Sequence, residues 1–356
     1  MKNYFPEDFS ETLFELLDID IEYLPDDCYE AIFKLNKHWV KGAELVDYHA
    51  DESTVLAYTL YYMPMNIPKL WSVLARCHKM MDSLIHKDKI RVVDIGSGPG
   101  TFSWALYFYL KEVYGAEIAA KLDFTLIDQS DLFLDKAKDL HTAFASETNL
   151  ELKKGQWQDL TDASYDLAIV ANILTEEADL SATCLNNIDA ESILILEPGT
   201  QRDFQRLLPL RAELMKNRKI HFPCTAHGDC PMAEDNWCHF NINRFVLPFI
   251  QMISNKAGRL NHKHNFCAFV FSEIEIAYAK NDWRVLSKLR RVKRSGIRWI
   301  CDGEDLVEAV LNRRKKSPGN TYFLEADTMA LIRIEQESLA KTGRIAEGST
   351  VNPPRQ

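Results

Sequence analysis

The chain has 356 residues, a formal net charge of −10 at pH 7 and 46% hydrophobic residues. This composition predicts a globular protein with a large core and two or three structural units. No uncharged apolar run reaches the roughly 18 residues of a membrane-spanning helix, so no membrane partner is expected. The overall acidity disfavours nucleic-acid binding unless positive charge is concentrated locally.

The beginning of the sequence and its cysteine content bear on the cellular compartment. The first residues are acidic and contain neither the apolar segment of a signal peptide nor the arginines of a transit peptide. We therefore expect a cytoplasmic protein of bacterial origin. Without a secretory signal, the eight cysteines favour free thiols or metal ligands over disulfide bonds.

Residues 1–85 are predicted to form a helical region. Apolar residues recur at helical spacing in residues 9–17 and again in residues 29–35. A further helix is expected to start near residue 51 and to be broken by Pro64 and Pro68. Two roles remain open for this region: a cap that faces a substrate, or a scaffold that packs against the rest of the protein.

The next segment carries the strongest motif of the chain. A short β-branched run contains Asp94 and leads into three alternate glycines, Gly96, Gly98 and Gly100, which a helix-forming stretch follows. This order predicts a strand, a tight turn and a helix. Glycines allow unusual backbone dihedral angles and the close approach of a ligand. The helix N-terminus behind them offers unpaired N–H groups and a positive dipole end.

The glycine spacing distinguishes between classes of nucleotide site. A P-loop requires a Lys that does not follow Gly100, and a dinucleotide fingerprint requires G-x-G-x-x-G. Asp94 to Gly100 instead resembles the first motif of class I S-adenosylmethionine-dependent methyltransferases, D-x-G-x-G-x-G. The resemblance implies that the turn packs against the methionine part of the cofactor and that the next strand ends in an acid that holds the ribose. The alternative is a glycine turn that binds nothing.

Residues 86–220 are predicted to form the cofactor-binding core, an α/β Rossmann-like sheet of parallel strands alternating with helices. Polar residues follow successive predicted strands: Asp128, Asp159 and Asn172. Ligands of such sheets bind beyond the carboxyl ends of the strands, so we expect these side chains to face the cofactor. Asp128 occupies the ribose position, unless it caps the following helix, and Asp159 is the candidate for the adenine amino group.

No catalytic residue is identified in this core. Methyltransferases that act on exocyclic base amines often carry [DNS]-P-P-[FYW] after the fourth strand, whereas this chain continues from Asn172 as Ile-Leu-Thr-Glu. A cysteine motif of the pyrimidine-C5 type is also missing.

Residues 221–265 form a Cys-rich insertion between core segments. Cys224, Cys230 and Cys238 lie in a loop rich in Pro, Gly and Asp. A loop this long and poor in aliphatic residues needs something to order it, and metal coordination would do so. Zinc and iron–sulfur both fit the residue types, although the spacing is looser than in zinc knuckles. The candidates for a fourth ligand are His227, His239, Cys267 and Cys301. Three unrelated thiols are the alternative.

The sequence around these cysteines identifies a family. Pro-Cys-x-x-His-x-x-Cys-Pro, followed by Trp-Cys-His-Phe, resembles the Rsm22 family of methyltransferase-like proteins, which includes bacterial members and mitochondrial small-ribosomal-subunit assembly factors. Residues 56–74, 196–200 and 290–301 match as well, so the resemblance covers most of residues 50–325.

The family resemblance implies cofactors and a partner. It implies a 4Fe-4S cluster held by four cysteines and S-adenosylmethionine bound in the core. The implied cluster ligands are Cys224, Cys230, Cys238 and Cys301. Cys267 lies in a predicted buried strand and is expected to belong to the core. The implied partner is the small ribosomal subunit or its 16S-type rRNA, with the protein otherwise monomeric.

Residues 266–340 are predicted to hold the remaining sheet strands and a basic region. Between residues 282 and 302 there are seven basic residues and no acidic one. The candidates for contacting RNA phosphates are Arg290, Arg291, Lys293 and Arg294. The alternative is a solvated face. Residues 341–356 are polar, contain Gly and two prolines, and are expected to be disordered.

Two functions from different classes remain open. The protein is either an rRNA methyltransferase, with iron–sulfur or zinc as its metal, or a small-subunit assembly factor that uses the methyltransferase fold only for binding. The missing motif after the fourth strand favours the assembly factor, and the intact cofactor motif keeps the methyltransferase open.

Overall fold

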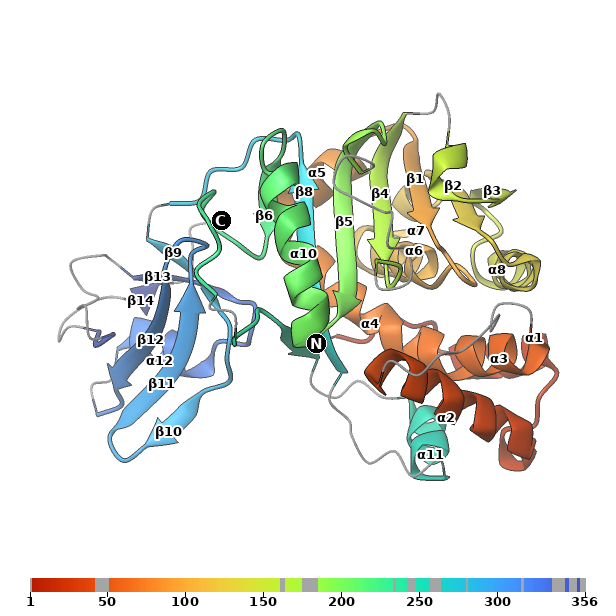
Figure 1. The fold of residues 1–356 in the computed structure, drawn as a ribbon, viewed down its shortest axis with the longest axis horizontal. Coiled ribbons are helices and arrows are strands. Elements are labelled where there is room, and N and C mark those ends of the chain that lie inside the picture. Colours follow the sequence, from red (N-terminus) through yellow and green to blue (C-terminus); the bar gives the residue numbers. More distant parts are fainter. Residues whose placement is uncertain are drawn as a thin grey trace.

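The fold contains two β-sheets and a set of helices (Figure 1). The computed structural model describes residues 2–41, 51–160, 164–174, 185–232, 235–242, 247–256, 264–279, 281–314, 317–334, 343–345 and 351–352. In these ranges no helix is long and apolar enough to cross a membrane.

The first sheet has the strand order β3-β2-β1-β4-β5-β8-β6, with β7 paired to β8. Its strands are β1 (Ile90–Ile95), β2 (Leu122–Asp128), β3 (Asn149–Lys154), β4 (Tyr165–Ala171), β5 (Ala190–Pro198), β6 (Lys219–Phe222), β7 (Phe240–Ile242) and β8 (His264–Ser272). β1 to β5 are parallel, and β8 runs antiparallel between β5 and β6. A parallel sheet with one antiparallel strand inserted near its edge is the class I methyltransferase arrangement, so the predicted Rossmann-like α/β fold is confirmed.

Helices cover both faces of this sheet, which explains its apolar strands. β1 reads Ile-Arg-Val-Val-Asp-Ile and is buried at every position except Arg91, as expected for a parallel strand packed on both sides. The helices of the core are α6 (Thr101–Tyr114), α7 (Ala116–Ala119), α8 (Asp131–Phe144) and α10 (Gln201–Leu214). α11 (Pro248–Lys256) lies against the N-terminal helices (Figure 1), where Phe249 contacts Phe14. The first ten residues of α6 are buried, because the N-terminal helices pack over it.

The N-terminal region is helical, as predicted. Its helices are α1 (Phe9–Leu17), α2 (Asp26–Lys41), α3 (Glu52–Ala57), the π-helical turn η3 (Tyr58–Tyr62), α4 (Met63–Leu74) and α5 (His78–Ile85). The expected break at Pro64 and Pro68 is wrong, because α3, η3 and α4 are continuous. Pro64 lies in the first turn of α4, where its missing N–H is least needed, and the π turn immediately precedes it.

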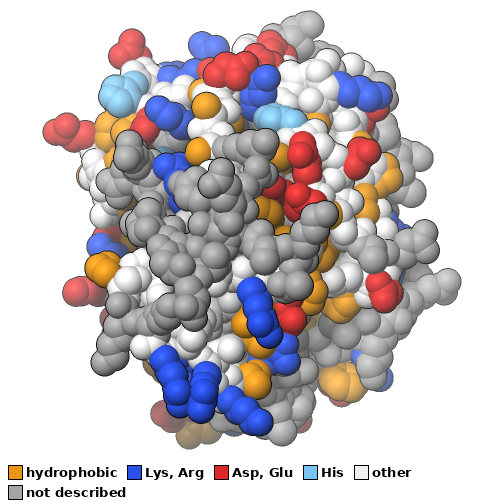
Figure 2. Space-filling model, turned by 90° about the vertical axis from the view of Figure 1, so that its left-hand side faces the viewer, with side chains coloured by type: hydrophobic (Ala, Val, Ile, Leu, Met, Phe, Trp, Pro, Cys, Tyr) orange, Lys and Arg blue, Asp and Glu red, His pale blue; other side chains and the backbone are white. Residues whose placement is uncertain are grey.

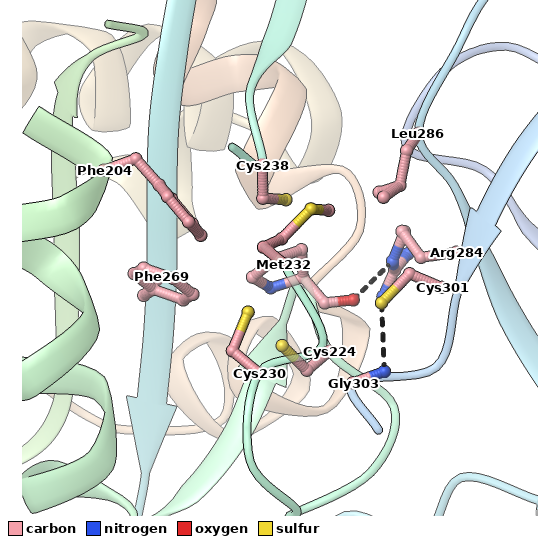
Figure 3. Close-up of a pocket in the computed structure, with 11 residues that line it drawn as sticks. Phe204, Cys224, Cys230, Met232, Cys238, Phe269, Arg284, Leu286, Cys301 and Gly303 are labelled. Atoms are coloured by element: carbon pink, nitrogen blue, oxygen red, sulfur yellow. Dashed lines mark hydrogen bonds between the residues drawn. The ribbon is translucent and has the colours of Figure 1, made fainter. Parts of the chain in front are cut away.

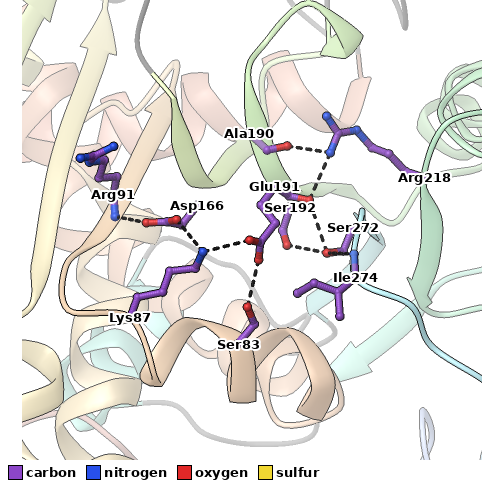
Figure 4. Close-up of polar contacts among 10 residues, drawn as sticks. All are labelled: Ser83, Lys87, Arg91, Asp166, Ala190, Glu191, Ser192, Arg218, Ser272 and Ile274. Atoms are coloured by element: carbon purple, nitrogen blue, oxygen red, sulfur yellow. Dashed lines mark hydrogen bonds and ion pairs between the residues drawn. The ribbon is translucent and has the colours of Figure 1, made fainter.

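The N-terminal helices reach both ends of the sheet. In Figure 1, α2, α3 and α4 lie beside the carboxyl ends of the parallel strands, and α5 lies at the amino ends. At the amino ends, Lys87 bridges Asp166 and Glu191 with N–O distances of 2.9 Å each (Figure 4). Ser83 also donates to Glu191. These ion pairs and the hydrogen bond attach α5 to the sheet at the edge opposite the glycine turn.

A second sheet follows the core in sequence and was not predicted as a separate unit. Its strands are β9 (Asp282–Val285), β10 (Arg290–Val292), β11 (Ser295–Cys301), β12 (Leu306–Asn312), β13 (Leu331–Ile334) and β14 (Val351–Asn352). Its order is β10-β11-β9-β13-β14, with β12 paired to β11. One face packs with α12 (Pro318–Glu325) around Trp283, Ile300, Phe323 and Ile332.

Part of the segment predicted to be disordered belongs to this sheet. Val351 and Asn352 pair with β13, and Arg344 bridges Val310. The correction concerns only the described residues 343–345 and 351–352, since the remainder of 341–356 lies outside the described ranges. The β-branched Val351 satisfies backbone groups of β13 that would otherwise form an open sheet edge.

Candidate cofactor edge and cysteine pocket

The three predicted glycines form the turn between β1 and α6. Gly96, Gly98 and Gly100 have φ angles of 62°, 54° and 79°, in the left-handed region that favours glycine. A Cβ on Gly96 would lie 2.4 Å from Cδ1 of Ile173, and one on Gly100 would lie 2.7 Å from the Trp104 ring. At Gly98 the nearest atom would be Cε1 of Tyr58 at 3.9 Å. Only Gly98 therefore faces open space, which lies beside η3.

Asp94 supports this turn from inside the core. Its carboxylate is buried, and Oδ2 accepts hydrogen bonds from the backbone N–H and the hydroxyl of Ser103. These contacts hold the first turn of α6 against β1. Sequence reasoning placed Asp94 among the cofactor-binding residues, and the structure gives it a positioning role beneath the glycine turn. Burial raises the pKa of Asp94 to about 7.

This raised pKa predicts a pH-dependent stability. In the unfolded chain the pKa of an Asp is about 3.9, so the folded protein binds a proton more tightly and is most stabilised below pH 4. The free energy of unfolding should fall as pH rises from about 4 to about 7, by a few kcal/mol from this group. Asp94→Asn should remove that component. Urea unfolding of both proteins across this range measures the difference, and a pH-independent difference would contradict the prediction.

Asp128 lies at the end of β2 and holds the glycine turn from the other side. Its Oδ2 accepts from the N–H of Gly98 at 2.8 Å, and its Oδ1 accepts from the N–H of Ser130 at 2.9 Å. The alternative role as a helix cap is not needed, because Ser130 caps α8 by accepting from Phe133. Asp128 thus lies directly beside the open side of Gly98.

Asn172 follows β4 at the same edge. It has a left-handed φ of 58°, and its N–H donates to the carbonyl of Leu196. Its Oδ1 is buried and, within the described ranges, has no hydrogen-bond partner. Thr101 Oγ1, at the start of α6, is also buried and lacks a hydrogen-bond partner within the described ranges. An unsatisfied buried polar atom costs about 1–3 kcal/mol, so two of them beside the glycine turn favour a polar ligand here.

For Asp159 the structure describes the backbone but not the side chain. It ends the short 3-10 helix η4 (Trp157–Asp159) after β3, and its side chain lies outside the described residues. The N–H of Gly155 donates to the carbonyl of Asp128, which attaches this segment to the same edge of the sheet. The structure therefore brings the backbone of all seven predicted cofactor residues to one edge.

Two residues of this edge were missed by sequence reasoning. Tyr58 lies over Gly98 from η3, so part of the N-terminal region acts as a cap at this edge. Glu197 is buried within the apolar β5, and its Oε1 accepts from the N–H groups of Ile173 and Leu174. The sequence signals for Glu197 were its place at the end of an apolar run and within residues 196–200, which carry part of the family resemblance.

A second candidate site is a pocket between the two sheets (Figure 3). Cys224, Cys230, Cys238 and Cys301 all line it, together with apolar side chains of Phe204, Met232, Phe269 and Leu286. The pocket is open on one side, and the space in and in front of it, solvent included, amounts to about 330 Å³. The four cysteines predicted as ligands therefore line one pocket, although 63 positions separate Cys301 from Cys238.

Backbone hydrogen bonds already join the two chain segments that carry these cysteines. The N–H groups of Thr225 and Ala226 both donate to the carbonyl of Asp302, at 2.8 and 2.6 Å. Gly303 has a left-handed φ of 109°, and a Cβ there would lie 2.9 Å from Cβ of Cys224. The loop after β6 is therefore closed onto the end of β11.

Two buried arginines lie next to the pocket. Arg211 donates from Nη2 to Cys224 Sγ at 3.6 Å, and Arg284 donates from Nε to the carbonyl of Pro223. Burial raises the pKa of the Cys224 thiol, and the Arg211 guanidinium opposes that rise. Nη2 of Arg284 is buried without a hydrogen-bond partner among the described residues. The surroundings thus combine low polarity with two positive charges.

Other potential ligands do not line this pocket. His239 stacks on Trp237, and Cys267 donates from Sγ to the carbonyl of Cys238 from within β8. His227 is also outside the lining. Within the described ranges, no group of three or more His, Cys, Asp or Glu side chains is arranged to hold a metal ion.

The predicted basic residues occupy the hairpin of β10 and β11. Arg290, Arg291, Lys293 and Arg294 are exposed, and Arg290 pairs with Glu308 at 2.6 Å. Figure 2 faces the second sheet and shows Lys and Arg side chains gathered at its lower end, where Figure 1 places β10. Two members of the basic run, Arg284 and Arg298, are instead buried, so they contribute to packing and not to this surface.

Comparisons with known proteins were made for the family and for the structure. The family model described as mitochondrial small ribosomal subunit Rsm22 matches residues 52–326. A search of curated proteins gave no match. Among solved structures, the plantazolicin methyltransferase BpumL with SAH is 14% identical, covering 71% of this chain and 99% of its own, with a TM-score of 0.38. The magnesium protoporphyrin IX methyltransferase of Synechocystis PCC 6803 with SAH is 11% identical, with coverages of 69% and 100% and a TM-score of 0.36.

Proposed function

The chain belongs to the Rsm22 family, and we propose on this basis that it binds S-adenosylmethionine and acts on the small ribosomal subunit or its rRNA. The observation that carries the proposal is the glycine turn of three left-handed residues, aligned with Asp128 and with the unsatisfied Oδ1 of Asn172 at one edge of the sheet. This edge offers a close backbone approach and polar groups for a nucleoside.

The residues at this edge carry chemical groups that suit S-adenosylmethionine. The open side of Gly98 would receive the methionine part, Asp128 would accept from the ribose hydroxyls, and the segment ending at Asp159 would border the adenine. Asp128 can accept further hydrogen bonds because each carboxylate oxygen has two lone pairs. When bound, S-adenosylmethionine supplies an electrophilic methyl group.

We also propose that the cysteine pocket holds a 4Fe-4S cluster through Cys224, Cys230, Cys238 and Cys301. Four thiols in an apolar pocket would ionise at great cost without a cationic partner, and such clusters are typically held by four cysteines. The partnerless Nη2 of Arg284 suits an anionic assembly of thiolates. When present, the cluster supplies a rigid link between the loop and β11.

The arrangement favours a cluster over a single zinc ion. Zinc at about 2.3 Å from each sulfur requires sulfurs about 3.8 Å apart. In a cluster each thiolate binds a different iron atom, so the sulfurs stand farther apart. The pocket also contains no histidine, which leaves His227 and His239 without the role that a zinc site would give them.

A second function, binding without methyl transfer, is favoured by the residues after β4. Here the chain presents Ile173, whose side chain lies against Gly96, and Leu174. The Glu197 carboxylate accepts from the backbone of both residues, so it fixes this segment. In the described part of this segment, residues 172–174, no side chain is an evident general base. An assembly factor that senses S-adenosylmethionine would need none.

One experiment separates these functions. Small-subunit rRNA from cells with and without the gene would be compared by mass spectrometry, and purified protein would be sedimented with small subunits. Association with the subunit together with a lost methyl group supports the methyltransferase. Association without any change in methylation supports the assembly factor. Absence of association would contradict both.

The basic hairpin predicts a salt-dependent association with the subunit. Reversing the charge of Arg291, Lys293 and Arg294 to Glu should weaken association, because contacts with phosphates release counterions. Arg290 contributes less, because Glu308 already pairs with it. The difference from wild type, measured by co-sedimentation, should be largest at low salt. Normal co-sedimentation of the triple variant at every salt concentration would show that this hairpin is only a solvated surface.

A further inference from the structure

The second sheet has one packed face and one open face. Residues directly opposite in antiparallel strands point to the same side. Ile300, Ala309 and Leu311 face the sheet's own hydrophobic core. Trp299 alternates with them and lies opposite Glu308, and Ile297 lies opposite both Arg290 and Val310. The side chains of Trp299, Ile297 and Arg290 therefore share the open face.

This open face carries two exposed large hydrophobic side chains. The indole of Trp299 is 42% exposed and Val292 is 41% exposed, and Ile297 is partly exposed between them. A large exposed aromatic side chain on a regular strand is more informative than scattered exposed aliphatics. Nothing in the packing of the second sheet requires Trp299 to face outward.

The backbone holds Trp299 rigidly. Its N–H donates to Oγ of Ser287 at 2.8 Å, and its carbonyl accepts from the N–H of Leu286 at 2.9 Å. The strand pairs on one side with β12 and is joined on the other side to the segment after β9. An aromatic ring on a rigid strand can stack on a planar ligand at a small cost in conformational entropy.

The surrounding charge indicates what kind of ligand carries the planar group. Lys293 and Arg294 are exposed in the turn of the hairpin that leads into β11, in a chain whose net charge is −10. The Glu308 opposite Trp299 is paired with Arg290 on the same face. Cations beside an exposed aromatic ring are the combination that binds single-stranded nucleic acid. A duplex would offer phosphates to the cations but would keep its bases stacked away from the indole.

We propose that the outer face of β10, β11 and β12 binds an unpaired segment of RNA, with one base stacked on Trp299 and the phosphates held by Lys293 and Arg294 in the turn between β10 and β11. This inference rests on the proposed ribosomal function for the choice of RNA as the polyanion. Beyond that function, it specifies that the bound RNA is unpaired and that Trp299 distinguishes unpaired from paired segments. The face also carries Cys301 two residues along β11, so the bound segment would lie next to the cysteine pocket.

The test uses the full-length protein and a short fluorescent oligoribonucleotide of mixed sequence, either single-stranded or annealed to its complement. Fluorescence anisotropy should give tighter binding of the single strand. Trp299→Ala should weaken single-strand binding about 5- to 150-fold, as expected for one lost stacked base, and should leave the salt dependence unchanged. Trp299→Phe should retain most of the affinity. Lys293→Glu should weaken both RNAs and reduce the salt dependence.

Tyr23→Ala is the matched control, because Tyr23 is 79% exposed on another part of the molecule. Unchanged binding by this variant and by correctly folded Trp299→Ala would overturn the stacking role. Equal affinity of wild type for single strand and duplex would overturn the preference for unpaired RNA. Wild type that binds small subunits but neither oligonucleotide would overturn this inference alone and would indicate a protein partner. Loss of subunit association altogether would overturn the proposed function as well.

Discussion

Cys301→Ser is expected to abolish the brown colour that an iron–sulfur cluster would give the protein. Anaerobically purified wild-type protein should contain about four iron and four sulfide per chain, as a 4Fe-4S cluster requires, and the variant should lose them. Cys301 is the only one of the four cysteines lining the pocket that comes from the second sheet. A serine at this position removes the fourth thiolate but keeps the side-chain volume. Ultraviolet–visible absorption and metal analysis of the purified variant measure the effect.

Cys267→Ser provides the matched control. Cys267 is more deeply buried than the pocket cysteines, but it lies within β8 and donates to the Cys238 carbonyl. A serine hydroxyl can make the same hydrogen bond, so this variant should keep its colour. Colourless wild-type protein with one zinc ion and no iron would contradict the assignment. Loss of colour in both variants would show that the pocket is sensitive to any change and would leave Cys301 without a special role.

Loss of the cluster should also loosen the joint between the two sheets. Without it, the loop after β6 is attached to the end of β11 mainly by the hydrogen bonds of Thr225 and Ala226 to Asp302. These two amides should therefore exchange with deuterium faster in Cys301→Ser than in Cys267→Ser. The hairpin proposed to bind RNA continues from the same strand, so loss of the cluster should also weaken RNA binding.

The sequence predicted the first sheet because its signals are local. The central parallel strands β1, β2 and β4 are short apolar runs that contain or are followed by a polar residue such as Asp128 or Asn172, and the rule for parallel sheets brings those ends to one edge. The four cysteines could be brought together only by the family resemblance, because spacing alone left His227, His239 and Cys267 open as ligands. Their placement in one pocket depends on the register of β11, which the sequence does not specify locally.

The second sheet was missed for a related reason. β9 pairs with β13 about fifty residues later, so no local pattern of hydrophobicity reveals the pairing. The same limit applies to charge. Arg298 and Trp299 are neighbours in a basic run, yet the strand buries the arginine and exposes the tryptophan. A count of basic residues overestimates the charged surface and overlooks the aromatic residue within it.

Gly98→Arg is expected to abolish S-adenosylmethionine binding with little loss of stability. Gly98 is the one glycine of the turn at which an added Cβ meets nothing closer than Tyr58 at 3.9 Å, so the arginine side chain can start there and fill the cofactor position. Its left-handed backbone costs a residue with a side chain roughly 1–2 kcal/mol. Gly96→Arg should also abolish binding, but the side chain would displace Ile173 and lower stability further. Isothermal titration calorimetry and thermal unfolding measure the two effects.

Two further variants make this prediction specific to the site. Gly115 also has a left-handed φ, 98°, with nothing within 4 Å of an added Cβ, and it lies at the far end of α6. With ψ at 162°, Gly115 occupies a region that side chains tolerate still less, so Gly115→Arg should impose at least as much backbone strain as Gly98→Arg while leaving binding intact. Asp128→Ala should weaken binding by about 1.5–3 kcal/mol, as for a lost hydrogen bond to a charged group, because it removes both the ribose acceptor and the bond that holds Gly98. If Gly98→Arg and Asp128→Ala bind as tightly as wild type, the cofactor does not occupy this edge.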